Sequence, residues 1–479
     1  MNPIENKRNL WNKSYTFNGY QDHVLISTIG SKTSNTELAE EADEKIIYME
    51  DLETRKQVYG ICGECNEPGT GWEWCQPCNA KRFKDNFKNW TSENKDIDVL
   101  IQQSQLNAVY RTKCLEWIPF ENFKDITYIT RGGFGKIYSA EWLKGCISSW
   151  DIENQKWIRT GEFKVALKSL DNSSCISTEF LNEVKSYLQI YIWKVIQCYG
   201  ITQDPSTKDY MMVLHYCENG NLRNYYLNNE SNYYSKISKL MGIAIGLLNI
   251  HNAGKIHKDF HSGNILFATI PYISDLGMCQ PANNENQSVK KEGTYGVLPY
   301  MAPEVLRGYQ YTKASDIYSF GIVMNEYISE ETPYNNVPHN HALAIKICKG
   351  LRPNIFKYTP KLLADLITKC WDAKPENRPT ARELYQKLEK LYFEQNKYHS
   401  QMDEYDDKIK LNGSSEKRSN NIQTHPQAIY TSRLLNFKNL PEPVNSDAIQ
   451  SVLLSECFDC QLDESDFNEI NQDDENNIE

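Results

Sequence analysis

The stretch Ile256-His257-Lys258-Asp259-Phe260-His261-Ser262-Gly263-Asn264 constrains this 479-residue chain more than any other. It follows a largely apolar run, residues 243–250, whose composition predicts a buried helix. Asp259 and Asn264 stand five positions apart. That spacing suits a loop in which a carboxylate meets the proton of a hydroxyl group and an amide oxygen meets a divalent cation. The stretch therefore indicates a catalytic loop.

A glycine-rich turn, Thr130-Arg131-Gly132-Gly133-Phe134-Gly135, lies upstream between two segments of strand-like composition. Glycines allow backbone N–H groups to approach phosphate oxygens without interference from Cβ atoms. The turn is not a Walker A loop, because Lys136 is followed by Ile137 rather than by serine or threonine. By itself it is a weak indication of a phosphate-binding loop.

Other motifs share one property, which is that they occur in a fixed order over residues 123–394. They are Val165-Ala166-Leu167-Lys168, the helical segment around Glu183, Met211–Gly220, Ile273-Ser274-Asp275-Leu276-Gly277, Ala302-Pro303-Glu304, Asp316–Gly321 and Cys370–Pro379. With the loop at Asp259, this order resembles the eukaryotic protein kinase domain, and within it the tyrosine-kinase-like group. The resemblance implies an α+β, bilobal fold with a β-rich N-lobe and a helical C-lobe.

The resemblance also implies transfer of the γ-phosphoryl group of ATP to a protein hydroxyl, with Mg²⁺ as the metal. Asp259 would accept the hydroxyl proton, while Asn264 and Asp275 would hold Mg²⁺. Lys168 would position the phosphates and would itself be oriented by Glu183; Glu179 is the competing partner, but Glu183 borders the core-facing side of its helix better. The nucleotide-contacting residues would be Arg131, Gly132, Gly133, Phe134, Gly135, Ile137, Ala166, Lys168, Leu214, His215, Cys217 and Leu266. Arg378 would form a buried ion pair with Glu304.

Four cysteines stand in two CxxC pairs, Cys62/Cys65 and Cys75/Cys78, separated by nine residues. Two such pairs can supply the four thiolates of a tetrahedral structural Zn²⁺ site, although the gap is shorter than in common zinc patterns. Four free thiols in a loop are the alternative. A thioredoxin-like redox role is disfavoured, because no βαβ pattern surrounds either pair.

Changes in composition along the chain divide it into regions. We expect a disordered region over 1–57 with a short helix over Glu37–Asp51, a zinc module over 58–85, a helical linker over 86–122, the kinase domain over 123–394 and a mostly disordered acidic tail over 395–479. Within that tail, Tyr430–Leu435 is a candidate docking segment. The net charge of −11 argues against nucleic acid as a partner. No apolar run is long enough for a membrane span, and no secretory signal begins the chain. A cytoplasmic protein with reduced cysteines is expected.

Three interpretations of function remain open. The first is a protein kinase that acts on protein substrates and signalling proteins and favours serine and threonine over tyrosine. The second is a pseudokinase scaffold, suggested by Thr130 in place of the first loop glycine and by Lys258 in place of arginine. The third is a zinc-binding adaptor, which leaves most of the chain unexplained. Ser288, Thr294 and Tyr295 are candidate phosphorylation sites between Asp275 and Glu304.

Overall fold

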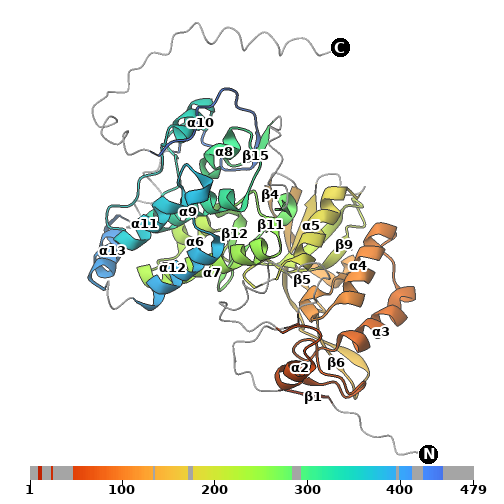
Figure 1. Ribbon diagram of the computed structural model, residues 1–479. Coiled ribbons are helices and arrows are strands. Elements are labelled where there is room, and N and C mark those ends of the chain that lie inside the picture. Colours follow the sequence, from red (N-terminus) through yellow and green to blue (C-terminus); the bar gives the residue numbers. More distant parts are fainter. Residues whose placement is uncertain are drawn as a thin grey trace, which may run out of the picture.

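The structure is a computed structural model that describes residues 9–12, 23–24, 47–132, 135–170, 176–191, 193–282, 293–394, 399–412 and 424–445. Gly133, Phe134 and Ser288, which the sequence singled out, lie outside the described residues, as do most of the first 46 residues and residues 446–479. The expected two-lobed architecture is confirmed: a sheet-rich lobe and a helical lobe lie side by side (Figure 1).

The N-lobe is built on one six-stranded sheet in which all neighbouring strands are antiparallel except β3 and β9. In spatial order its strands are β3 (Glu116–Trp117), β9 (Cys198–Gln203), β10 (Tyr210–His215), β8 (Phe163–Leu170), β5 (Gly135–Trp142) and β4 (Phe123–Gly132). Helix α5 (Thr178–Gln189) begins at Ser177, whose side chain accepts a hydrogen bond from the Phe180 amide, and it buries Phe180, Val184 and Tyr187. Its apolar face therefore packs into the core while Glu183 remains beside the sheet.

The C-lobe is helical. Its helices are α6 (Leu222–Asn228), α7 (Tyr233–Asn252), α8 (Pro303–Leu306), α9 (Lys313–Ser329), α10 (His341–Cys348), α11 (Lys361–Cys370), α12 (Ala381–Phe393) and α13 (His399–Asn412). Short strand pairs lie between and beside them: β11 (Lys255–Ile256) with β14 (Gln280–Pro281), β12 (Ile265–Phe267) with β13 (Pro271–Ile273), and β15 (Thr294–Gly296) with β16 (Arg433–Leu435). Capping boxes at Thr312 and Thr380 begin α9 and α12 by satisfying their first backbone donors.

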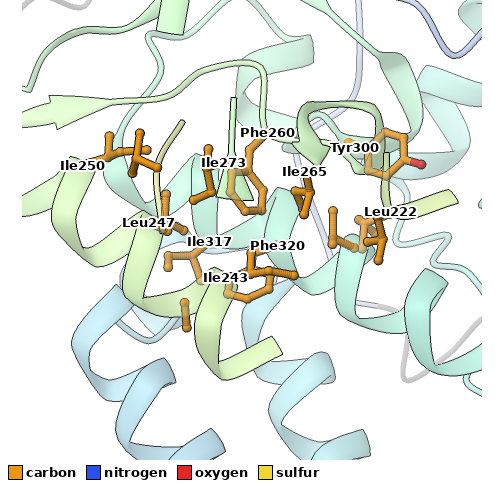
Figure 2. Packing of buried hydrophobic residues seen from close by; sticks show 14 of the residues in the cluster. Leu222, Ile243, Leu247, Ile250, Phe260, Ile265, Ile273, Tyr300, Ile317 and Phe320 are labelled. Atoms are coloured by element: carbon orange, nitrogen blue, oxygen red, sulfur yellow. The ribbon is translucent and has the colours of Figure 1, made fainter. Parts of the chain in front are cut away.

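The core of the C-lobe lies directly beneath the loop that carries Asp259. Figure 2 shows Phe260 close to Phe320 of α9, and their ring centroids are 5.4 Å apart. Ile243, Leu247 and Ile250 of α7 belong to the same buried cluster. Burial of Phe260 therefore ties the loop to α7 and α9, and its neighbour Asp259 is held at the edge of a rigid core.

The N-terminal module contains α2 (Leu52–Tyr59), α3 (Gln76–Asn86), α4 (Lys95–Asn107) and the strand pair β1 (Leu10–Trp11) and β2 (Gly60–Ile61). The helix expected over Glu37–Asp51 is not seen where that range is described, since residues 47–51 form a bridge and a turn. Helix α2 begins only at Leu52, because the Asp51 side chain caps it by accepting a hydrogen bond from the Thr54 amide.

The module docks on the hairpin formed by β6 (Ile147–Asp151) and β7 (Lys156–Arg159), the insertion between β5 and β8. Trp157 of this hairpin stacks on Phe83 of α3 with 4.9 Å between centroids and on Trp74 with 5.9 Å. Trp74 also donates a hydrogen bond from Nε1 to the Ala108 carbonyl, 2.7 Å away. Stacked aromatic pairs add to the area they bury, so the hairpin joins the cysteine-rich module to the N-lobe.

Part of the segment after residue 394 is ordered, in contrast to the expected mostly disordered tail. Tyr405 of α13 is fully buried and donates a hydrogen bond to the Ile328 carbonyl at 2.6 Å. Residues 424–445 also pack on the C-lobe, and strand β16 lies within them. The partners in these contacts are far apart in the sequence, so the local periodicity of the segment could not predict them. Within the described ranges, no helix has the length and apolarity needed to cross a bilayer.

Candidate active site

Three charged side chains meet between the lobes. Lys168 Nζ on β8 lies 2.7 Å from Glu183 Oε1 on α5 and 3.0 Å from Asp275 Oδ1, which follows β13. Lys168 and Glu183 are almost completely buried, whereas the Asp275 side chain is 26% exposed. Of the two candidate partners, the structure places Glu183 on the lysine, while Glu179 lies on the exposed side of α5. Asp275 is thus the most exposed of the three side chains.

The pKa values of these groups reflect their mutual charge. Burial alone would lower the pKa of Lys168, but the Asp275 and Glu183 carboxylates raise it above its usual value. Burial raises the pKa of Glu183, and the Lys168 ammonium offsets only part of that rise. Burial would also raise the pKa of Asp275, but the charge of Lys168 and its hydrogen bond lower it. The lysine is therefore a permanent cation in an otherwise acidic site.

Asp259 lies at the base of the same space and is 5% exposed. Its Oδ2 lies 3.5 Å from His261 Nε2. The side-chain nitrogen of Asn264, Nδ2, donates to the backbone carbonyl oxygen of Asp259 at 2.9 Å and to its Oδ2 at 3.3 Å. Burial would raise the pKa of Asp259, but the His261 ring and hydrogen bonds from His261 and Ser432 lower it to about 2. The carboxylate is thus an ionised acceptor, and the Asn264 side chain uses its nitrogen as a donor to Asp259.

His261 has a defined tautomer. Its Nδ1 accepts a hydrogen bond from the Gly263 amide at 3.1 Å, so the proton of the neutral ring is on Nε2, which faces Asp259. In the sequence this residue is one member of the stretch 256–264. The structure makes it the neighbour that orients the Asp259 carboxylate.

The backbone of the loop is held by a second carboxylate, Asp316 in the first turn of α9. Asp316 is 1% exposed and accepts hydrogen bonds from the amides of His257 (2.8 Å) and Lys258 (3.0 Å), and from His251 Nε2 (2.9 Å). Hydrogen bonds to a charged acceptor are stronger than neutral ones. They hold Lys258 at a φ of 72°, an uncommon conformation for a non-glycine residue that sets the direction of the chain into Asp259.

The remaining predicted nucleotide contacts lie around the lysine. Ile137 pairs with Lys168 across β5 and β8, and Ala166 pairs with Leu214 across β8 and β10. Leu266 of β12 approaches from the C-lobe and is partly buried against the main core. Arg131 and Gly132 end β4, Gly135 begins β5, His215 ends β10, and Cys217 lies two residues after β10. The strand pairings thus place Ile137, Ala166 and Leu214 on the sheet that carries Lys168.

One contact was not anticipated as part of the site. Ser432 Oγ donates a hydrogen bond of 2.5 Å to Asp259 Oδ2, although the two residues are 173 positions apart. The sequence signal was weak: residues 430–435 stood out as a docking segment, but nothing indicated where they would dock.

The four predicted zinc ligands also meet. The sulfur atoms of Cys62, Cys65, Cys75 and Cys78 all lie within 4.8 Å of one another. Cys62 Sγ is 3.9 Å from Cys78 Sγ, and Cys65 Sγ is 3.6 Å from Cys75 Sγ. Tetrahedral Zn²⁺ with bonds of about 2.3 Å requires sulfurs about 3.8 Å apart, so the cluster fits this ion. Arg55 braces the loop by donating to the carbonyls of Gly69 at 3.0 Å and Pro68 at 2.7 Å.

A lysine cation between two carboxylates, with the ionised Asp259 at the base of the same space, is the arrangement characteristic of the protein kinase class. Residues 123–388 match the family model described as protein tyrosine and serine/threonine kinase, and the chain belongs to that family. It is 25% identical to the tyrosine-protein kinase SPK-1 of Girardia tigrina over 57% of this chain and 53% of the relative.

Two relatives from Dictyostelium discoideum carry other specificities in their names. The RGS domain-containing serine/threonine-protein kinase A is 29% identical over 52% of this chain and 23% of the relative. The dual specificity protein kinase zakA is 27% identical over 69% of this chain and 43% of the relative. The chain therefore spans about half or less of the length of these relatives. The names of the relatives thus include tyrosine, serine/threonine and dual specificity.

We expect Glu183→Gln to lower phosphotransfer by about 10- to 100-fold, because the loss of its charge lets the Lys168 ammonium shift away from the phosphates. Glu179→Gln on the exposed side of α5 is the matched control and should stay within about twofold of wild type. Steady-state rates at saturating ATP measure both. Equal rates for the two variants would remove Glu183 from the site.

Proposed function

We propose that this chain is an ATP- and Mg²⁺-dependent protein kinase that phosphorylates serine and threonine in preference to tyrosine. The observation that supports this most directly is the arrangement of Lys168, Glu183 and Asp275 opposite the ionised Asp259. When bound, ATP and Mg²⁺ supply an activated phosphoryl group whose charge is shared with the metal.

The chain's own residues supply position and charge. Lys168 would bind phosphate oxygens, with Glu183 keeping its ammonium in place. Asp275 and the Asn264 oxygen would hold the metal. Asp259 would orient the acceptor hydroxyl and take its proton, and its low pKa keeps it ionised at neutral pH. Preorganised charge of this kind is usually the largest contribution to catalysis.

The proposed preference for serine and threonine is supported by the length of side chain that fits between the strap strand and Asp259. Strand β16 of residues 424–445 pairs with β15, and from that edge the side chain of Ser432 reaches Asp259. A tyrosyl hydroxyl lies an aromatic ring further from its backbone, so the same strand position would carry it past the carboxylate. Protein substrates that use this edge should therefore present short hydroxyl side chains.

The test is incubation of the purified full-length chain with labelled ATP and casein, with and without Mg²⁺, followed by phospho-amino-acid analysis. We expect Mg²⁺-dependent incorporation, mainly as phosphoserine and phosphothreonine. A product dominated by phosphotyrosine would overturn the specificity. Nucleotide binding without any incorporation would identify a pseudokinase scaffold instead.

We also propose that the four-cysteine cluster binds one structural Zn²⁺. Four thiolates complete the tetrahedron and leave no open position, so the ion would stabilise the module rather than take part in chemistry.

Metal analysis tests the cluster. Cys65→Ser should contain one zinc per chain less than wild type, because one of four ligands is lost. Cys146→Ser, a partly buried cysteine outside the cluster, is the control and should keep the wild-type content. Equal zinc in the Cys65→Ser variant and in wild type would end the proposal.

We place this activity in the cytoplasm, in intracellular signalling. All eleven cysteines within the described residues are free thiols, which is the usual state in a reducing compartment. Fractionation of cells that express the tagged chain tests this assignment, and recovery in a secreted fraction would contradict it.

A further inference from the structure

Residues 424–445, which we call the C-terminal strap, run across the segment between Asp275 and Glu304 of the same chain. Strand β16 of the strap pairs antiparallel with β15, with Gly296 opposite Arg433, Tyr295 opposite Leu434 and Thr294 opposite Leu435. β15 lies between Asp275 and Glu304. The strap therefore adds a strand to the segment that borders the active site, in the way that extended peptides bind to exposed sheet edges.

The first part of the strap is anchored beside the loop between α9 and α10. The His425 amide donates to the Asn335 carbonyl at 2.8 Å, and the His339 amide donates to the Gln427 carbonyl at 3.0 Å. Tyr430 donates from its hydroxyl to the Pro333 carbonyl at 2.8 Å and packs edge-on against the His339 ring. Backbone and side-chain contacts thus fix the chain two residues before Ser432.

Tyr430 also connects the strap to a buried polar network. The Arg223 guanidinium lies 4.3 Å from the centre of the Tyr430 ring, a cation–π distance. Arg223 in turn contacts Glu326, which is fully buried and accepts hydrogen bonds from Ser262 at 3.0 Å and Tyr300 at 2.7 Å. Ser262 belongs to the catalytic loop, so the strap docks on the structure that positions Asp259.

The part of the strap after Ser432 is anchored by apolar and charged contacts. Leu435 is 7% exposed, and Arg433 donates to the His339 carbonyl at 2.6 Å. Glu442 forms a two-pronged ion pair with Arg307, just after α8. At the far end, Asn445 Oδ1 accepts from the Ala373 amide at 2.7 Å. Anchors on both sides leave Ser432 little freedom to move away from Asp259.

On these observations we propose that Ser432 is a phosphorylation site, and that the strap delivers its hydroxyl to Asp259 as an intramolecular substrate. This inference rests on the proposed kinase activity. The Ser432 hydroxyl already donates to the Asp259 carboxylate, which is the contact an acceptor needs before transfer. A hydroxyl from any other protein would have to occupy the same place, so the strap and external substrates exclude one another.

The reaction balances with the nucleoside triphosphate that the proposed activity uses. The Ser432 oxygen forms a bond to the γ-phosphorus, and the bond from that phosphorus to the β,γ-bridging oxygen breaks. The nucleoside diphosphate leaves with the electron pair of the broken bond. The proton of Ser432 passes to Asp259 and from there to solvent. Nothing is oxidised or reduced.

The product is expected to leave the site. A phosphoserine carries a charge of about −1.5 to −2 at neutral pH. At Ser432 that charge would face the Asp259 carboxylate, and like charges this close repel one another. Phosphorylation of Ser432 should therefore weaken the hold of the strap and open the acceptor position to other proteins.

The test uses the full-length chain with ATP, Mg²⁺ and casein, with phosphorylation sites mapped by mass spectrometry. We expect phosphate on Ser432. A tethered acceptor has an effective concentration in the millimolar range, so its rate constant should stay unchanged over a roughly 100-fold dilution of the enzyme. Ser432→Ala should lose this phosphorylation, whereas Thr431→Ala, at the exposed neighbouring position, should keep Ser432 phosphorylated at the wild-type rate.

Two further variants make the result decisive. Leu435→Asp places a charge at a buried anchor and should slow Ser432 phosphorylation at least about tenfold, while casein is still phosphorylated. Leu434→Asp, at a neighbour that is 60% exposed, is the matched control and should leave the rate unchanged. An equal rate of Ser432 phosphorylation in both variants would show that docking of the strap does not deliver Ser432 to Asp259.

A tagged Asp259→Asn chain, mixed with wild type, tests whether transfer is intramolecular. We expect almost no phosphate on its Ser432; labelling at the wild-type rate would overturn the inference. If casein is phosphorylated but Ser432 is not, the inference fails while the proposed function stands. If neither is phosphorylated, the proposed function fails and the inference fails with it.

Discussion

Lys168→Met should reduce phosphotransfer to casein by at least about 100-fold, equivalent to roughly 2.7 kcal/mol of transition-state stabilisation. Methionine has nearly the length of lysine but no charge to place on phosphate oxygens. Loss of the Lys168 ammonium also leaves Glu183 and Asp275 without the cation that they contact at 2.7 and 3.0 Å. The two carboxylates would then repel each other, and Glu183, whose pKa burial already raises, would take up a proton.

Lys164→Met is the matched control for this variant, because Lys164 lies on the same strand, β8, with its side chain exposed. It should retain activity within about twofold. Initial rates at saturating casein and varied ATP, with thermal unfolding of each protein alongside, separate lost catalysis from lost folding. A Lys168→Met variant that is folded and transfers phosphate at the wild-type rate would show that the site works without this lysine.

Arg378→Ala should lower the free energy of unfolding of the C-lobe by about 3–5 kcal/mol, the usual cost of breaking a buried ion pair from one side. Arg378 forms two parallel hydrogen bonds with Glu304, of 2.7 and 2.8 Å. It also donates to the carbonyls of Ala314 at 3.0 Å and Asp372 at 2.8 Å. Alanine would leave a mostly buried carboxylate and two carbonyls without these donors.

The control for Arg378→Ala is Lys361→Ala, which removes an exposed pair with Asp365, four residues away on α11. Exposed pairs of this kind contribute about 0.3–0.5 kcal/mol, so the control should unfold almost like wild type. Urea unfolding followed by circular dichroism compares the three proteins. A loss below about 1 kcal/mol for Arg378→Ala would mean that Glu304 finds another partner in the folded state.

Much of the site was predictable because its chemistry depends on residue type at short spacing. Asp259 and Asn264 are five positions apart and occupy one loop, so their geometry is a local property. The CxxC pairs behave in the same way, because each pair brings two thiols together within one turn. The choice of Glu183 over Glu179 was also local, because helical periodicity decides which of two residues on one helix faces the sheet.

Other features depend on contacts that no short stretch encodes. The orientation of His261 toward Asp259 depends on the hydrogen bond from Gly263 to its ring. The role of the β6–β7 hairpin depends on Trp157 meeting Phe83 of a separate module. In both cases the residue type was visible in the sequence, but its partner was selected only by the folded chain.

The sequence alone determined the family, the two-lobed fold, the order of the predicted catalytic residues and the presence of four closely spaced cysteines. These are consequences of local spacing and of apolar periodicity within single elements. The tertiary structure alone decided where residues 424–445 lie. Strand β16 is three residues long and too short to carry a periodic signal, and its backbone donors and acceptors are satisfied by β15 across a separation of more than a hundred residues. Only that pairing, together with the anchors at Tyr430 and Leu435, brings Ser432 to Asp259.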